Sequence, residues 1–145
     1  MCICVNERKM EEYLDIFKAL SDNTRLRTIC LLIKAKGELC LCEVADALGK
    51  NHYNVSRHFK VLKRAGLVKE HWEGRYVFYS LAEPQKLFQE HILKAVSTIR
   101  KKLLKDDYKR LKLRLTLRED GKCVVGMNSR EWGKKLSLFI NKDKD

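Results

Sequence analysis

The sequence predicts a mainly α-helical domain that carries one small β-hairpin, and three observations support this class. Before residue 67, apolar residues recur at spacings of three and four, the period of helices with one buried face. Residues 68–81 are rich in aromatic and β-branched side chains around a Glu-Gly turn, which is typical of a hairpin. After residue 84 the helical spacing of apolar residues returns. The 145 residues, with one proline and seven glycines, have the size and composition of one ordered domain.

Two helices are expected before residue 38. The first covers residues 11–20, and its apolar face is formed by Tyr13, Leu14, Phe17 and Leu20. Asp22 then suits the N-cap of a second helix over residues 24–36, which Gly37 ends. The buried stripe of the second helix contains Leu26, Ile29, Cys30, Leu32 and Ile33. Residues 1–9 have no clear period and are expected to form an N-terminal arm.

The stretch from Glu38 to Leu67 predicts two short helices joined by a tight turn. Apolar residues at helical spacing are Leu41, Val44, Ala45 and Leu48 in the first, and Val55, Phe59 and Leu62 in the second. Gly49 stands where the first helix would end, and Asn51 where the second would be capped. The second helix is basic. Two such helices followed by a hairpin form a winged helix-turn-helix, a fold that reads DNA.

A long helix is predicted from Pro84 to Leu104, since proline is tolerated in a first turn. Its surplus of apolar positions favours a dimer. Beyond residue 106, strict alternation over residues 111–117, a turn at Asp120–Gly121 and the segment Cys123–Val125 predict a second hairpin. Residues 127–145 would form a short helix or a tail. The expected organisation is an arm (1–9), a winged helix-turn-helix domain (10–104) and a C-terminal extension (105–145).

The net charge of +12 is unevenly distributed. Residues 1–49 carry seven basic and eight acidic side chains, whereas residues 50–80 carry seven and two, and residues 100–118 carry nine and two. Clustered positive charge is typical of nucleic-acid binding. No apolar run has the ~20 residues that a membrane span requires, and Met1–Val5 is too short for a signal peptide. We therefore expect a prokaryotic cytoplasmic protein with no membrane partner, whose six cysteines are thiols.

Four segments resemble the ArsR/SmtB family of winged-helix metalloregulatory repressors: ALSDNTRLR (19–27), ELCLCEV (38–44), VSRHFKVL (55–62) and AGLV (65–68). They stand in the family's order, and the resemblance spans roughly residues 10–104. It implies a homodimer that binds a near-palindromic, double-stranded operator and is released when an inducer ion binds. It implies neither an enzyme nor a protein with an organic cofactor or a small organic substrate.

A recognition helix places its first turns on base edges and uses basic residues for phosphates. In this sequence it covers residues 52–63. The candidates for base contacts are His52, Tyr53, Asn54, Ser56 and Arg57, and the candidates for phosphate contacts are Lys50, His58, Lys60 and Lys63. Arg75, at the hairpin tip, is the candidate for the minor groove, whose negative potential attracts arginine.

Cys40 and Cys42 indicate a sensor for a thiophilic ion. Residues i and i+2 lie about 200° apart around a helix, so both sulfurs reach one ion only if the first turn loosens or if the pair lies at or before the helix start. An ion that draws them together is therefore expected to distort this helix. Thiolates select As(III), Sb(III), Cd(II), Pb(II) or Zn(II). Three sulfurs suit As(III) best, because its lone pair takes the fourth position, whereas four suit the divalent ions.

The sequence leaves the third sulfur open. Arsenic sensors of the family often carry it three residues after the pair, where this chain has Ala45. The cadmium/lead sensors use cysteines of an N-terminal arm, which makes Cys2 and Cys4 the preferred candidates here. Cys30, in an apolar stripe, and Cys123, after a turn, are the other two.

The zinc sensors of the family use a second site on the long helix, and Glu90-His91 does not reproduce it. A competing hypothesis keeps the DNA reader and makes the thiols a redox or persulfide switch. A thiol oxidoreductase is disfavoured because the Cys-x-Cys follows no βαβ pattern. A DNA-architectural protein with passive cysteines is a further alternative. The leading expectation is a repressor released by an ion, As(III) in first place, bound through Cys40 and Cys42.

Overall fold

The computed structural model describes residues 3–144, with side chains from residue 7 onward. Its helices are α1 (Ile3–Leu20), α2 (Asn23–Ala35), α3 (Leu41–Leu48), α4 (His52–Arg64), α5 (Leu87–Ser97), the 3-10 turn η1 (Lys101–Leu104), α6 (Lys105–Leu115) and α7 (Arg130–Lys142). Its strands are β1 (Leu39–Cys40), β2 (Val68–Glu73) and β3 (Tyr76–Leu81). They form an antiparallel sheet in the order β1-β3-β2. The predicted fold class, a winged helix-turn-helix, is confirmed.

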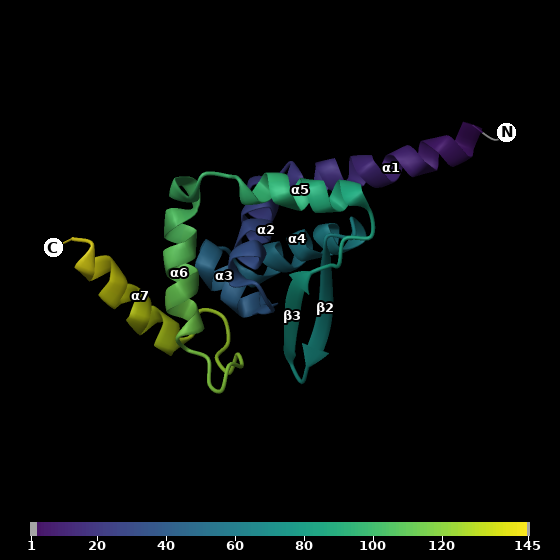
Figure 1. Cartoon of the computed structure of the whole chain (residues 1–145). Helices are drawn as coiled ribbons and strands as arrows, with labels where there is room; N and C mark the ends of the chain where they lie inside the picture. The colour runs from purple at the N-terminus through teal and green to yellow at the C-terminus, as the bar shows by residue number, and fades with distance from the viewer. Residues whose placement is uncertain (1–2, 145) are drawn as a thin grey trace.

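The hairpin of β2 and β3, here called the wing, projects from one side of the helices, while α1 and α5 run along the opposite side (Figure 1). The chain then turns and α6 descends beside α3 (Figure 1). One apolar core joins α2, α3, α4, the wing and α6. Among the described residues, no helix is long and apolar enough to cross a membrane.

The first helix begins at Ile3, eight residues before the predicted start. Residues 7–12 are exposed, so they carry no buried stripe by which the sequence could reveal a helix. The predicted apolar face is also rotated, because Ile16 and Ala19 are buried while Leu14 and Phe17 are about half exposed. The predicted cap of α2 is confirmed, since an Asp22 carboxylate oxygen accepts the Arg25 N–H at 3.0 Å.

The predicted turn between α3 and α4 is confirmed at both ends. Gly49 adopts a left-handed conformation (φ 62°) at the end of α3. The Asn51 side chain accepts the backbone N–H of Asn54 at 3.0 Å and caps α4. Unlike the single buried stripe that the sequence showed, all eight residues of α3 are buried. Helix α3, the first helix of the α3–α4 pair that we call the DNA reader, is therefore enclosed on every side.

The wing is fixed to the recognition helix by aromatic stacking. The rings of Phe59 on α4 and Tyr79 on β3 lie 3.7 Å apart between centroids and are nearly parallel, at 5°. Lys63 on α4 donates to Glu70 on β2 at 2.6 Å, which lowers the pKa of that carboxyl. The short strand β1, which the sequence did not indicate, pairs with β3 and completes the sheet.

The predicted long helix over residues 84–104 is wrong, because α5 covers only residues 87–97 and a 3-10 turn follows at residues 101–104. The hydroxyls of Ser97 and Thr98 donate to the carbonyl oxygens of Lys94 and Ala95, each at 2.6 Å. Such bonds compete with continuation of a helix. Arg100 then adopts an extended ψ of 120°, which turns the chain away from the axis of α5.

The predicted second hairpin is also wrong, because residues 105–115 form α6. The segment with alternating leucines also has apolar residues at helical spacing. Of these, Leu104 and Leu111 lie in the main core, and Tyr108 and Leu115 pack against it. Of the hairpin only the turn at Asp120–Gly121 remains, flanked by a bridge between Glu119 and Lys122. The final segment forms α7, capped by Ser129 and attached through the buried Trp132.

Candidate metal centre and DNA-reading surface

Cys40 and Cys42 already meet without deforming a helix. Cys40 is the extended N-cap residue of α3 (φ −70°, ψ 147°), and Cys42 lies in the first turn. Cys40 is also paired with Phe78 across β1 and β3, which fixes its backbone. The two Sγ atoms are 3.0 Å apart. The pair thus lies at the helix start, and the expectation that an ion must distort α3 to bring the sulfurs together is wrong in its premise.

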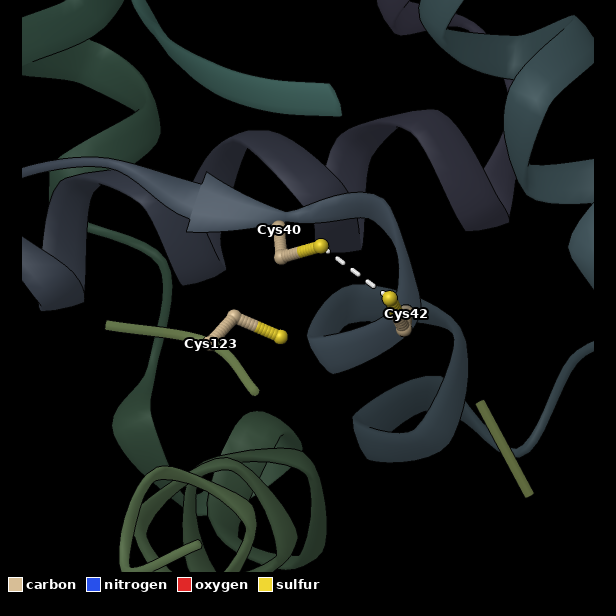
Figure 2. A group of neighbouring side chains, drawn as sticks. All are labelled: Cys40, Cys42 and Cys123. Carbon is tan, nitrogen blue, oxygen red and sulfur yellow. Dashed lines mark hydrogen bonds between the residues drawn. The ribbon is translucent and has the colours of Figure 1, made fainter. Parts of the chain in front are cut away.

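Cys123 supplies a third sulfur from far along the chain. The Sγ atoms of Cys40, Cys42 and Cys123 all lie within 4.8 Å of one another, and all three residues are buried. Figure 2 shows the three side chains pointing toward a common centre from β1, α3 and the C-terminal segment. We call this group the thiol cluster. Among the described residues no His, Asp or Glu joins it.

The other cysteines stand in different positions. Cys30 lies in the main apolar core, where burial raises the pKa of its thiol to about 11. Cys2 lies outside the described residues, and so does the side chain of Cys4. Cys123 was one candidate among four in the sequence. It lies 83 and 81 positions after Cys40 and Cys42, too far for a local spacing to indicate that the residues meet.

Protonation of the three sulfurs is coupled. Contact with the Cys123 sulfur and burial raise the pKa of both Cys40 and Cys42. Donation from these two thiols lowers the pKa of Cys123, and the positive charge of Arg114 adds to that effect. These contacts favour deprotonation of Cys123 before Cys40 or Cys42. A thiolate is the form that binds metals.

Two buried carboxylates of α3 hold the segment that carries Cys123. We call residues 118–128 the cysteine loop. At its start, Arg118 makes two hydrogen bonds to Glu43, at 2.6 and 2.7 Å. Glu43 also accepts the Cys40 N–H at 2.8 Å, so one carboxylate links the loop to the backbone of the first thiol. Bidentate arginine–carboxylate pairs of this kind are strong and directional.

The far end of the cysteine loop is bound to Asp46. This carboxylate accepts one hydrogen bond from Arg114 Nε–H at 2.7 Å and another from the backbone N–H of Asn128 at 2.9 Å. Arg114 is completely buried and also donates to the Val125 carbonyl oxygen at 2.7 Å. Burial raises the pKa of Asp46, and Arg114 and the Asn128 N–H oppose that rise. The loop is therefore anchored to α3 on both sides of Cys123.

The wing also touches the thiol cluster. Tyr76, on β3, packs with Met127 against a cluster of buried side chains that includes all three cysteines. Its hydroxyl donates to the carbonyl oxygen of Val124 at 3.2 Å, next to Cys123. The sulfurs consequently lie where three parts meet: the wing, the first helix of the DNA reader and the C-terminal extension.

This donor set fits a thiophilic ion. Three sulfurs with no oxygen or nitrogen ligand favour soft ions. The surrounding charges already balance, since Glu43 pairs with Arg118 and Asp46 with Arg114. A trivalent ion and three thiolates together are neutral. Such a complex needs no further charged partner in these buried surroundings.

The ten residues predicted to contact DNA lie on α4, in the turn before it, or at the wing tip. Eight are exposed: Lys50, His52, Tyr53, Asn54, Arg57, Lys60, Lys63 and Arg75. Tyr53 is 79% exposed, an unusual position for an aromatic ring without a partner. Ser56 and His58 are half-buried. His58 faces α2, with its Nδ1 3.3 Å from Arg25 Nη1.

A basic recognition helix next to a basic wing tip, on a winged helix-turn-helix frame, defines a DNA-binding transcription regulator. Residues 22–70 match the profile of the family described as "Bacterial regulatory protein, arsR family". The chain is 36% identical over 96 residues to the arsenic resistance transcriptional regulator ArsR1 of Pseudomonas putida, covering 66% of this chain and 74% of that protein. It therefore belongs to the ArsR/SmtB family, whose members are transcription regulators and not enzymes.

Two further similarities concern metals and assembly. The chain is 42% identical over 66 residues to a homologue of the cadmium resistance regulatory protein CadC from Staphylococcus aureus, covering 46% of this chain and 54% of that protein. The homodimeric winged helix-turn-helix DNA-binding domain Mb0332 of Mycobacterium bovis has the same fold, with a TM-score of 0.53 and 25% identity over 72% of this chain and 87% of that one. Cys123 lies outside the segment that matches the family profile.

Proposed function

We propose that the chain is a transcriptional repressor whose affinity for its operator falls when As(III) binds to Cys40, Cys42 and Cys123. The observation that carries this proposal is the thiol cluster: three buried sulfurs within 4.8 Å, at the start of the first helix of the DNA reader. The similarity to a regulator named for arsenic resistance supports the choice of ion.

Charge supports As(III) and Sb(III) over divalent ions. Three thiolates neutralise a trivalent ion, and the two carboxylate–arginine pairs around the cluster leave no further charge to match. Cd(II), Pb(II) or Zn(II) on the same three sulfurs would leave one buried negative charge, which is costly without a partner. These ions also favour a fourth ligand. Cys2 and Cys4 are the proposed source of that ligand for a divalent ion.

The DNA-bound form is proposed to be a homodimer on a near-palindromic duplex. Each subunit would contact bases through the start of α4 and phosphates through its lysines, as assigned above, with Arg75 in the minor groove. The dimer interface is assigned to α1 and α5, where large apolar side chains are exposed: Met10, Leu14, Phe17 and Leu87. Mb0332, with the same fold, is homodimeric.

Release is proposed to follow from the position of the cluster. Cys40 belongs to a strand paired with the wing, Cys42 to α3, and Cys123 to the cysteine loop. An ion bonded to all three sulfurs would fix these parts to one another and set the spacing of the sulfurs, which are now within 4.8 Å. Only the short turn at residues 49–51 joins α3 to α4. A shift of α3 against the wing would therefore change the position of α4 relative to the wing, and with it the fit of α4 and the wing to DNA. A coupling free energy of about 1–3 kcal/mol between ion and operator is typical of such linkage.

The test is a binding titration. A fluorescent duplex is first selected by the protein from a random-sequence pool, and its anisotropy is followed as arsenite, Cd(II) or Zn(II) is added under reducing conditions. Arsenite should release the wild-type protein. Cys123→Ser and the double variant Cys40→Ser/Cys42→Ser should stay bound, whereas Cys30→Ala, which alters a core cysteine outside the cluster, should respond as wild type. Release of the double variant by arsenite would refute the site.

A second candidate function has one observation in its favour. The sulfurs of Cys40 and Cys42 are 3.0 Å apart, close enough for an oxidant to join thiols of the cluster. A redox or persulfide switch would then release DNA without any metal. In the same assay, release by a mild oxidant together with no response to arsenite would select this function. Replacing Cys2 and Cys4 with serine tests the arm separately.

A further inference from the structure

A groove of about 330 Å³ extends from Cys40 and Cys42 of the thiol cluster to residues predicted to contact DNA. Its floor includes Cys40, Leu41 and Cys42. One wall belongs to α4 and consists of His52, Ser56, Lys60 and Lys63. The other wall belongs to the wing and consists of Glu70, Trp72, Arg75, Tyr76, Val77 and Tyr79. We call this space the reader groove. Its outer residues, such as Lys60 and Trp72, are exposed, so the groove opens to solvent.

Protein packs against the thiol cluster on the sides away from the reader groove. Tyr76 and Met127 pack against the cluster, and the cysteine loop covers it through Cys123. Arg114, fully buried, occupies the side toward α6. Four further surface cavities of residues 7–144 are lined without any of the three cysteines. Of these five cavities, the reader groove is the one lined by Cys40 and Cys42.

The walls of the groove are also half of the predicted DNA surface. Five of the ten residues assigned to DNA contacts line it: His52, Ser56, Lys60, Lys63 and Arg75. A duplex held by these side chains would lie across the opening between α4 and the wing tip. The same residues would therefore hold DNA and border the path to the sulfurs.

We propose that arsenite reaches the thiol cluster through the reader groove and that operator DNA closes this route. The proposal rests on the function proposed above. Arsenite arrives as uncharged As(OH)₃, and each of the three cysteine thiols replaces one hydroxyl on arsenic. Three As–O and three S–H bonds break, three As–S bonds form, and the thiol protons leave with the hydroxyls as three water molecules. The free repressor then captures the ion, whereas the operator complex must dissociate first.

Kinetics test this order with the wild-type chain. Formation of As–S bonds is followed by stopped-flow near-ultraviolet absorbance at increasing arsenite, with and without saturating duplex. For free protein the rate should rise in proportion to arsenite. With duplex it should level off at the dissociation rate of the complex, measured separately by challenge with competitor DNA. A rate that keeps rising with arsenite beyond the dissociation rate would overturn the proposal.

A variant tests the route without DNA. Ser56→Trp places a large side chain in the groove wall and should slow arsenite capture by about tenfold or more, while the final absorbance shows that the cluster still fills. Ser137→Trp makes the same change on α7, away from the groove, and should capture arsenite at the wild-type rate. Equal rates for Ser56→Trp and wild type would place the route elsewhere.

Thiol labelling separates this proposal from the choice of ion. A maleimide reacts with accessible thiols whether or not arsenite is the inducer, and peptide mass spectrometry reports Cys42 alone. Duplex should protect Cys42 of the wild-type chain, and labelling unchanged by bound duplex would refute closure of the groove. A protein that is protected by duplex yet shows no arsenite absorbance would instead refute the proposed ion while the groove assignment stands.

Discussion

Arg114 on α6 and Asp46 on α3 form a 2.7 Å ion pair in which both side chains are almost completely removed from solvent. The pair joins the first helix of the DNA reader to the C-terminal extension. Arg114 reaches onward to the carbonyl oxygen of Val125, and Asp46 to the N–H of Asn128, so the pair holds the far end of the cysteine loop.

Removing one member of this pair should be strongly destabilising. Arg114→Met leaves the Asp46 carboxylate buried without its partner, and loss of one partner of a buried pair costs about 3–5 kcal/mol. The double variant Asp46→Leu/Arg114→Met should recover part of this loss, because it leaves no lone charge. Urea denaturation measures both. Lys94→Ala, which removes an exposed pair with Glu90, is the control and should change stability by less than about 0.5 kcal/mol. An equally small effect of Arg114→Met would show that the pair does not hold α6 on α3.

Tyr76→Phe should weaken arsenite binding without unfolding the wing. It removes only the hydroxyl that donates to Val124, next to Cys123. A hydrogen bond of this kind contributes about 1 kcal/mol, so the dissociation constant for arsenite should rise by roughly fivefold. Near-ultraviolet titration measures it in the absence of DNA. Tyr53→Phe alters an exposed tyrosine outside the cluster and should leave arsenite affinity unchanged. Unchanged affinity in Tyr76→Phe would mean that the wing does not steady the loop.

The cap of α2 should give a stability difference that depends on pH. Asp22→Ala removes the acceptor for the Arg25 N–H and should cost about 1 kcal/mol at neutral pH. That N–H lowers the pKa of Asp22 below its ordinary 3.8, so the stabilisation is present above the unfolded-state pKa and is lost as pH falls through the folded-state value.

The free energies of unfolding of wild type and Asp22→Ala should therefore become equal in strong acid, and denaturant unfolding at neutral and strongly acid pH measures this. Asp15→Ala, at an exposed position on α1, is the matched control and should have little effect at either pH. A difference between wild type and Asp22→Ala that persists in strong acid would contradict an ionised cap.

Operator binding should depend steeply on salt. If the dimer contacts ~8 phosphates, the slope of log affinity against log salt is roughly −7. Lys60→Ala removes one phosphate contact per subunit and should make the slope shallower by roughly 2. Anisotropy titrations at several salt concentrations measure both slopes. Lys134→Ala, on α7, removes the same charge outside the reader and should leave the slope unchanged.

Local signals in the sequence predicted the reader closely. The caps at Asp22 and Asn51 and the left-handed Gly49 depend on neighbouring residues, and the structure has all three. The end of α5 was missed because side-chain hydrogen bonds at Ser97 and Thr98 compete with helix continuation. Helix α6 was predicted as a hairpin because its leucines fit both the helical and the strand period.

Two of the three members of the thiol cluster were predicted, because Cys40 and Cys42 are separated by a single residue whereas Cys123 is far along the chain. The sequence does contain one indication that the segment around Cys123 packs on α3. The short, otherwise apolar helix α3 carries two carboxylates, Glu43 and Asp46, three residues apart, and the later segment carries Arg114 and Arg118, four apart. Since charges are rarely buried unpaired, two acidic residues on an enclosed helix indicate two basic partners. These partners bring Cys123 to the helix start.

The cysteine loop takes its shape from the protein before any ion arrives, because Glu43 and Asp46 hold it on either side of Cys123. Ordering a flexible loop around a ligand reduces the free energy of binding. Here the loop is ordered when the chain folds, so binding an ion does not carry that cost. The folded protein therefore presents Cys123 beside Cys40 and Cys42 in advance, so little of the binding free energy goes into ordering the loop.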